Sequence, residues 1–159
     1  MNEMLQLLEN NARLSEEQLA MMLGKEKGEI RAMIEKFERE RVILGYKALI
    51  DWDKTDKESV TALIEVKITP QRDRGFDRIA EKIYNDPEVE SLYLMSGAFD
   101  FTVIIEEKTM RAVAQFVSDK LAPMEAVMST ATHFVLKKYK DHGTVLVGES
   151  NDERMLITP

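Results

Sequence analysis

Residues 15–41 read SEEQLAMMLGKEKGEIRAMIEKFERER and decide the fold of the first part of the chain. Ser15 stands three residues before Gln18, which is the spacing of a capping box at the start of a helix. Gly24 suits the C-terminal end of that helix, because glycine readily adopts the left-handed conformation found there. A second helix is expected at residues 26–41. Two amphipathic helices joined by a tight turn are typical of a helix-turn-helix.

Apolar residues at helical spacing predict a small core formed by three helices. A buried helical face repeats at i, i+3, i+4 and i+7. We expect the first helix to bury Met4, Leu5, Leu8 and Ala12, the second Leu19, Met22 and Leu23, and the third Ile30, Met33, Ile34 and Phe37.

The segment after these helices changes character. Val42, Ile43 and Leu44 favour a strand and Gly45 permits a turn, so residues 42–52 are expected to form an extended arm. We therefore predict a three-helix winged helix-turn-helix domain at residues 1–50, followed by a linker at 51–59. Trp52 lies at this junction and is either an anchor between domains or a half-covered surface ring.

From Val60 the apolar residues alternate, which is the period of a half-buried strand. The resulting order, βαββαβ, predicts a ferredoxin-like domain at residues 60–141, with two helices on one face of a four-stranded sheet. The fold class is therefore α+β. In chain order we expect a strand at 60–69, a helix at 76–83, strands at 88–95 and 99–106, a helix at 110–121 and a strand at 126–138.

The other face of this sheet is too apolar for free solvent. An exposed patch of that size predicts a partner surface, and a homodimer is the commonest arrangement. Larger oligomers remain open. The expected members of the face are Leu63, Leu92 or Tyr93, Thr102, Ile104, and either Phe134 or His133.

Composition and charge restrict the partners. The chain has no cysteine, which excludes disulfides and thiolate metal sites and favours a reducing cytoplasm. It has neither a signal-peptide pattern nor a long apolar run, so no membrane association is expected. The net charge is −7, of which −1 falls in residues 1–50 and −6 in residues 51–159. Any binding to DNA must therefore use a local basic patch.

The order and spacing of four segments resemble the Lrp/AsnC family of prokaryotic transcription regulators over residues 2–141. They are the helix-turn-helix, ERERVILGYKALID, VTALIEVKI, and LYLMSGAFDFTV, whose SGAFDF at 96–101 matches the family's glycine-aspartate hairpin signature. The resemblance implies double-stranded DNA and a small-molecule effector, commonly an amino acid, as partners. It implies dimers formed by paired sheets, and an effector held between dimers near this hairpin.

The resemblance places the effector beside Leu94, Gly97, Asp100, Met110, His133 and Phe134. Asp100 could accept hydrogen bonds from an ammonium group, and backbone N–H groups near Gly97 could hold a carboxylate. Leu94, Met110 and Phe134 could select an apolar side chain. Asp100 could equally close the turn after Gly97, and His133 could be a structural histidine on an apolar strand.

Residues around the third helix are the candidates for contact with DNA. Basic side chains can reach guanine edges, and Glu29 could accept a hydrogen bond from a cytosine amine. The alternative is that these residues form only a solvated helix face of paired charges, without contact to DNA. The candidates are Lys25, Lys27, Glu29, Arg31 and Lys36.

The sequence therefore predicts a DNA-binding regulator that senses an amino acid, and no catalytic motif argues for an enzyme. An alternative, motivated by the acidic balance, is a sensing module with weak or no DNA binding that acts through hetero-oligomers. No cofactor is expected. His133 and His142 are nine residues apart and make a poor metal site. The tail, residues 142–159, is expected to form a hairpin or an arm that pairs with another subunit.

Overall fold

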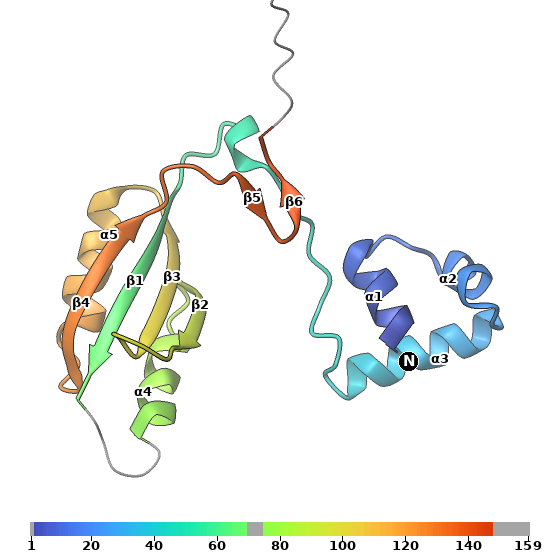
Figure 1. Ribbon diagram of the computed structural model, residues 1–159, viewed down its shortest axis with the longest axis horizontal. Coiled ribbons are helices and arrows are strands. Elements are labelled where there is room, and N and C mark those ends of the chain that lie inside the picture. The colour runs from blue at the N-terminus through green and yellow to red at the C-terminus, as the bar shows by residue number, and fades with distance from the viewer. Residues whose placement is uncertain (1, 70–74, 148–159) are drawn as a thin grey trace, which may run out of the picture. The chain divides into compact units, whose positions relative to one another are not determined.

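The structure, a computed structural model, describes residues 2–69 and 75–147 and contains two compact units (Figure 1). The first is Met1–Ile50 and the second is Asp51–Pro159. Each unit has its own cluster of buried apolar side chains. No helix in the described ranges is long and apolar enough to cross a membrane.

The first unit contains the three predicted helices, α1 (Asn2–Asn10), α2 (Glu16–Leu23) and α3 (Lys27–Arg39). Its core draws on all three helices, because each buries one apolar stripe. The buried residues are Met4, Leu8, Leu19, Ile30 and Phe37, with Met33 and Ile34 packed against them.

Both ends of α2 are capped as the sequence predicts. The Ser15 hydroxyl accepts a hydrogen bond from the Gln18 backbone at 3.2 Å, and the Gln18 side chain accepts one from the Ser15 backbone at 2.9 Å. These reciprocal bonds satisfy two backbone N–H groups that a helix start leaves unpaired. Gly24 ends the helix with φ of 62°, a left-handed conformation that disfavours other residues.

Two expected burials in the first unit are wrong, and the strand that Val42, Ile43 and Leu44 favour does not form. Met22 is 58% exposed, because Leu19, Ala20 and Leu23 form the inward face of α2. Ala12 is exposed and lies beyond the end of α1. Residues 42–51 form no strand, although Ile43 packs against the helical core. A strand needs a hydrogen-bonded neighbour, and none of the described residues pairs with this segment.

The second unit confirms the predicted ferredoxin-like fold. After a short 3-10 turn, η1 (Trp52–Lys54), its sheet has the order β2-β3-β1-β4 with every neighbour antiparallel, and α4 and α5 cover one face (Figure 1). The elements are β1 (Val60–Ile68), α4 (Gly75–Tyr84), β2 (Val89–Leu94), β3 (Phe101–Glu107), α5 (Met110–Phe116), a π-helical turn η2 (Val117–Leu121) that continues α5, and β4 (Val127–Phe134).

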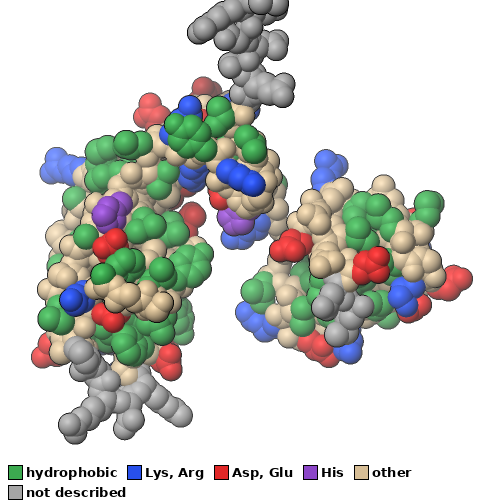
Figure 2. Space-filling model, viewed as in Figure 1, with side chains coloured by type: hydrophobic (Ala, Val, Ile, Leu, Met, Phe, Trp, Pro, Cys, Tyr) green, Lys and Arg blue, Asp and Glu red, His purple; other side chains and the backbone are tan. Residues whose placement is uncertain are grey.

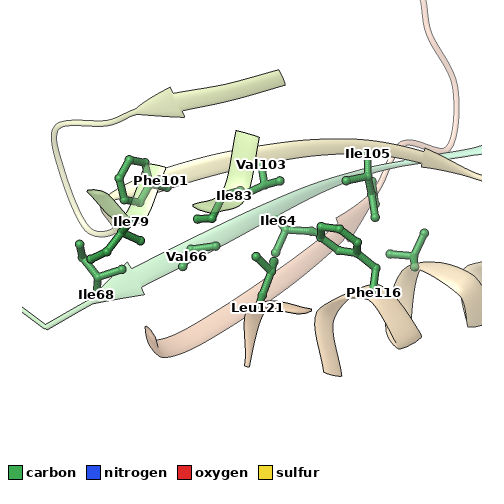
Figure 3. Close-up of a cluster of buried hydrophobic side chains, with 12 residues drawn as sticks. Ile64, Val66, Ile68, Ile79, Ile83, Phe101, Val103, Ile105, Phe116 and Leu121 are labelled. Carbon is green, nitrogen blue, oxygen red and sulfur yellow. The ribbon is translucent and has the colours of Figure 1, made fainter. Parts of the chain in front are cut away.

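The core of this unit lies between the sheet and its helices (Figure 3). Alternate residues of β1 and β3 point toward the helices, as the period of two requires. Phe116 from α5 and Leu121 from η2 pack against this face. The sheet contributes Ala62, Ile64, Val66 and Ile68 from β1 and Phe101, Val103 and Ile105 from β3, and α4 contributes Ile79 and Ile83.

A small hairpin follows the sheet, with β5 (Lys140–Asp141) paired to β6 (Thr144–Val145). His142 and Gly143 form its turn with φ of 43° and 81°, and two positive φ angles match the two-residue turns preferred in hairpins. The tail was expected to form a hairpin or an arm over residues 142–159, of which 148–159 lie outside the described residues. β4 ends at Phe134, four residues before the predicted end.

Candidate functional site

The exposed surface of α3, together with Lys25 in the turn before it, carries the residues predicted to contact DNA. Successive helical residues turn by about 100°, so Lys27 and Arg31 lie close together on one side of the helix. Glu29 and Lys36 lie on the other side, with the buried Ile30 facing the core. The predicted set is therefore divided between two sides of one helix.

Two carboxylates of α2 bind the basic pair of α3. The Arg31 guanidinium donates to Glu16 from Nε at 3.0 Å and from Nη2 at 2.8 Å, which is a forked arrangement. Lys27 forms an ion pair with Glu17 and lies 4.0 Å from Glu16. The hydrogen bond from Arg31 lowers the pKa of Glu16, and that from Lys27 lowers the pKa of Glu17.

The other two predicted cations are also paired. Lys25 contacts Glu29 one helical turn away, and Lys36 lies 3.9 Å from Glu40. Every basic side chain of the predicted DNA-contacting set thus has a carboxylate within 4.0 Å. The pairs are exposed, and acidic and basic side chains are interspersed on the visible face of the first unit (Figure 2). A phosphate that binds the donors now held by glutamate must compete with the glutamate oxygens.

Sequence reasoning missed several residues on this surface. Gly28, Ala32 and Arg39 lie on the strip of α3 opposite Ile30 and are all exposed. The first two leave room for close approach of a partner, since a Cβ added at Gly28 would meet nothing within 4 Å. Arg39 adds a cation in the last turn. The spacing from Ile30 alone identifies this strip.

Three of the predicted effector residues come together at the β2–β3 hairpin. Leu94 ends β2 and is 61% exposed, and Gly97 has φ of 132°, a region that favours glycine. Asp100 closes the loop, because its backbone carbonyl accepts from Met95 at 2.8 Å. Its carboxylate also accepts from the Ile68 backbone at 2.8 Å. These two hydrogen bonds are the contacts expected if Asp100 closes the turn.

The other three predicted effector residues lie elsewhere in the unit. Met110 begins α5, just beyond the end of β3 that lies away from the hairpin. The six residue steps of β3, at about 3.3 Å each, put this end about 20 Å from the hairpin. His133 and Phe134 are on β4, at the opposite sheet edge from β2, about 14 Å across three strand spacings. Phe134 packs on the core, whereas His133 is on the helix-free face. The six predicted effector residues therefore do not form one pocket within a single chain.

The helix-free face of the sheet contains the predicted apolar residues. The register assigns Tyr93 and His133 to this face rather than Leu92 and Phe134. His133 Nε2 lies 3.2 Å from Glu65 on the same face. Thr102 is only 5% exposed, since Glu65 and Tyr93 flank it on the neighbouring strands. The remaining apolar members are Leu63 and Ile104, both half-buried.

Comparison with known proteins places this architecture in a family. Residues 61–145 match the Lrp/AsnC ligand binding domain. The chain is 49% identical over 158 residues to the HTH-type transcriptional regulator YugG of Bacillus subtilis, covering 99% of this chain and 95% of that relative. A proline dehydrogenase transcriptional activator of Rhizobium radiobacter is 24% identical over 141 residues, covering 89% and 90%.

Solved structures share the fold. A transcriptional regulator from Neisseria meningitidis in complex with L-Met has a TM-score of 0.70 at 25% identity, covering 87% of this chain and 88% of that one. AsnC of E. coli has a TM-score of 0.66 at 20% identity, covering 85% and 89%. The fold and the relatives define an HTH-type transcriptional regulator rather than an enzyme. The chain belongs to the Lrp/AsnC family.

Proposed function

We propose that this protein is a cytoplasmic, sequence-specific DNA-binding regulator that senses an amino acid. The observation that carries the proposal is the capped helix-turn-helix with Lys27 and Arg31 at the start of its second helix. In such units the N-terminal residues of the second helix contact base edges in the major groove. We assign DNA binding to residues 1–50, linkage to 51–59, effector binding and oligomerisation to 60–141, and the tail to 142–159.

The DNA-contacting side chains have separate roles in this proposal. Lys27 and Arg31 share one side of α3 and bind phosphates or guanine edges. Flanking phosphates are bound by Lys25, in the turn before α3, and by Lys36, on the other side of α3. Glu29 accepts from a cytosine amine once Lys25 turns to the DNA backbone.

The proposed effector is an amino acid bound beside the β2–β3 hairpin. Leu94 contacts its side chain, Asp100 its ammonium group, and the backbone near Gly97 its carboxylate. Met110 and His133 lie too far from the hairpin in one chain, so a site using them needs a second subunit. The L-Met complex of the Neisseria meningitidis regulator supports this ligand class.

We further propose that the helix-free sheet face forms a homodimer interface. Leu63 and Ile104, paired on the two central strands, give this face an apolar centre, and burial of such surface favours association. A ligand bound between subunits then changes the spacing of the DNA-reading helices, provided it binds one arrangement more tightly than another.

A second candidate function is an assembly and sensing module with little DNA binding of its own. The pairing of all four predicted cations with carboxylates favours it. It predicts that the protein binds a ligand, mixes with more basic relatives, and shifts no promoter fragment.

The test is a titration of the protein against its own upstream DNA, with excess nonspecific competitor at two salt concentrations. A specific complex that weakens with salt is expected, and the variant K27A/R31A should weaken it without changing oligomer size. The matched control is R13A/K47A, which removes the same charge from the first unit outside α3. Unchanged affinity in K27A/R31A would refute the groove assignment, and absence of any specific complex would favour the second candidate.

Effector binding is tested by calorimetric titration with each common amino acid. The variant D100N should lose binding, because it removes the charge that pairs with the ammonium group. An asparagine carbonyl can still accept from the Ile68 backbone, so the hairpin should stay closed. Equal affinity in D100N and the unaltered protein would remove Asp100 from the site.

A further inference from the structure

The carboxylates of Glu16 and Glu17 form ion pairs with Arg31 and Lys27, the two cations that the proposed function assigns to DNA binding. Glu16 receives a forked contact from Arg31, and Glu17 contacts Lys27. Both glutamates lie in the first turn of α2, whereas both cations lie in the first half of α3. The contacts therefore join the two helices of the helix-turn-helix across its exposed surface.

We propose that Glu16 and Glu17 limit the affinity of this protein for DNA by competing with phosphates for Lys27 and Arg31. The inference rests on the proposed function of α3. It assigns these glutamates a regulatory role on the DNA-reading surface rather than a role in the core, and the chemical class with which they compete is the phosphodiester backbone.

Exposure is the first argument for competition. The side chains are 48% exposed at Lys27, 57% at Arg31 and 61% at Glu17, and 29% at Glu16. Pairs so open to water contribute little to folding, since solvent screens them. They can open at small cost, and until they open the carboxylates hold Nε and Nη2 of Arg31 and the ammonium of Lys27, so a phosphate competes for the same donors. Capping of α2 does not need them, because Ser15 and Gln18 supply it.

Charge is the second argument. DNA affinity rises with each phosphate that a protein neutralises, through release of counterions. A cation that leaves a glutamate for a phosphate leaves an unpaired carboxylate beside the polyanion. Lys27 and Arg31 therefore contribute less than two net positive charges in the complex. Replacing each carboxylate with an amide restores that charge and retains the shape of the side chain.

The expected effect follows from these terms. An exposed ion pair changes an equilibrium by a factor of roughly 1.5 to 5. The variant E16Q/E17Q should therefore bind DNA about 2 to 20 times more tightly than the unaltered protein. Its plot of log affinity against log salt should be steeper by up to about 0.9 per carboxylate removed.

The matched control is E3Q/E9Q, on the exposed face of α1. It changes the net charge of the first unit equally, and neither residue forms an ion pair with the described part of the chain. A gain confined to E16Q/E17Q supports competition. An equal gain in the control would show a general charge effect and overturn the proposal, as would unchanged affinity in E16Q/E17Q.

A double-mutant cycle tests the Glu16–Arg31 contact directly. The gain from E16Q should shrink toward none in the R31A background, because the cation it releases is absent. If E16Q weakened binding instead, Glu16 would be a positioning residue that orients the guanidinium, and the proposal would be wrong. Circular dichroism and melting curves check that each variant folds.

The same experiment separates this inference from the proposed function. If K27A/R31A bound DNA as tightly as the unaltered protein, the groove assignment would fail and the competition with it. If the unaltered protein bound no specific DNA but E16Q/E17Q bound duplex DNA at low salt, the competition would stand and the protein would be a restrained binder. If neither bound DNA under those conditions, the competition would be refuted.

Discussion

Ile30→Ala tests whether the first unit depends on its own small core. Ile30 is 0% exposed and lies at the centre of the cluster formed by α1, α2 and α3. Truncation of a buried isoleucine to alanine costs about 2 to 5 kcal/mol. A unit of this size has a stability of about 2.5 to 7.5 kcal/mol, taking roughly 0.05 to 0.15 kcal/mol per residue. At the middle of both ranges, a cost of about 3.5 out of about 5 kcal/mol, the substitution removes most of the stability of Met1–Ile50.

The assay is hydrogen exchange resolved by peptide, together with the DNA titration. Peptides from α1 to α3 should exchange much faster in I30A and DNA binding should be lost, while peptides from β1 and β3 keep their protection. Ile64→Ala is the matched contrast, because Ile64 is equally buried in the other core. Ile30→Val should cost only about 0.5 to 1.5 kcal/mol and leave the unit folded. Equal loss of protection in both units of I30A would refute separate cores.

Three further outcomes are expected. Ser15→Ala removes the capping box and should destabilise the first unit by about 1 kcal/mol, measured by denaturant unfolding; an unchanged midpoint would contradict the cap. Since the pKa of Glu16 is lowered in the folded chain, its pairing is complete above the ordinary pKa of 4.5 and is lost as pH falls through the lowered value; carboxyl NMR should show this midpoint rising in R31A. Ile104→Lys should turn the proposed homodimer into a monomer by light scattering, whereas Tyr84→Lys on exposed α4 should not; a persistent dimer in I104K would exclude the sheet face as the interface.

Short-range patterns predicted the local elements well. The capping residues of α2 and the buried stripe of α3 follow from contacts within one or two turns, so the sequence contains the information. The alternation along β1 likewise fixes which face is buried. The predicted burial of Met22 was wrong. Leu19, Ala20 and Leu23 already fill the inward face of α2, so Met22 stays exposed.

Long-range placement was the part that the sequence could not predict. The contact between Glu16 and Arg31 joins residues fifteen apart and depends on how α2 packs against α3. The predicted effector residues follow a family pattern, yet strand order places His133 on the opposite sheet edge from Leu94. Asp100 needed the structure as well, since its bond to the Ile68 backbone spans thirty-two residues.

Competition by Glu16 and Glu17 would have a consequence for specificity. These carboxylates oppose every phosphate, whatever the base sequence, so they lower nonspecific and specific binding together. Base-edge contacts are gained only at the correct site and can offset the cost there. When one DNA-reading helix binds weakly, occupancy of the DNA depends on the helices of two subunits binding together. The first contact raises the effective concentration of the second helix at the DNA. We therefore expect DNA binding to fall steeply when the dimer dissociates, and a ligand that alters subunit arrangement to control it.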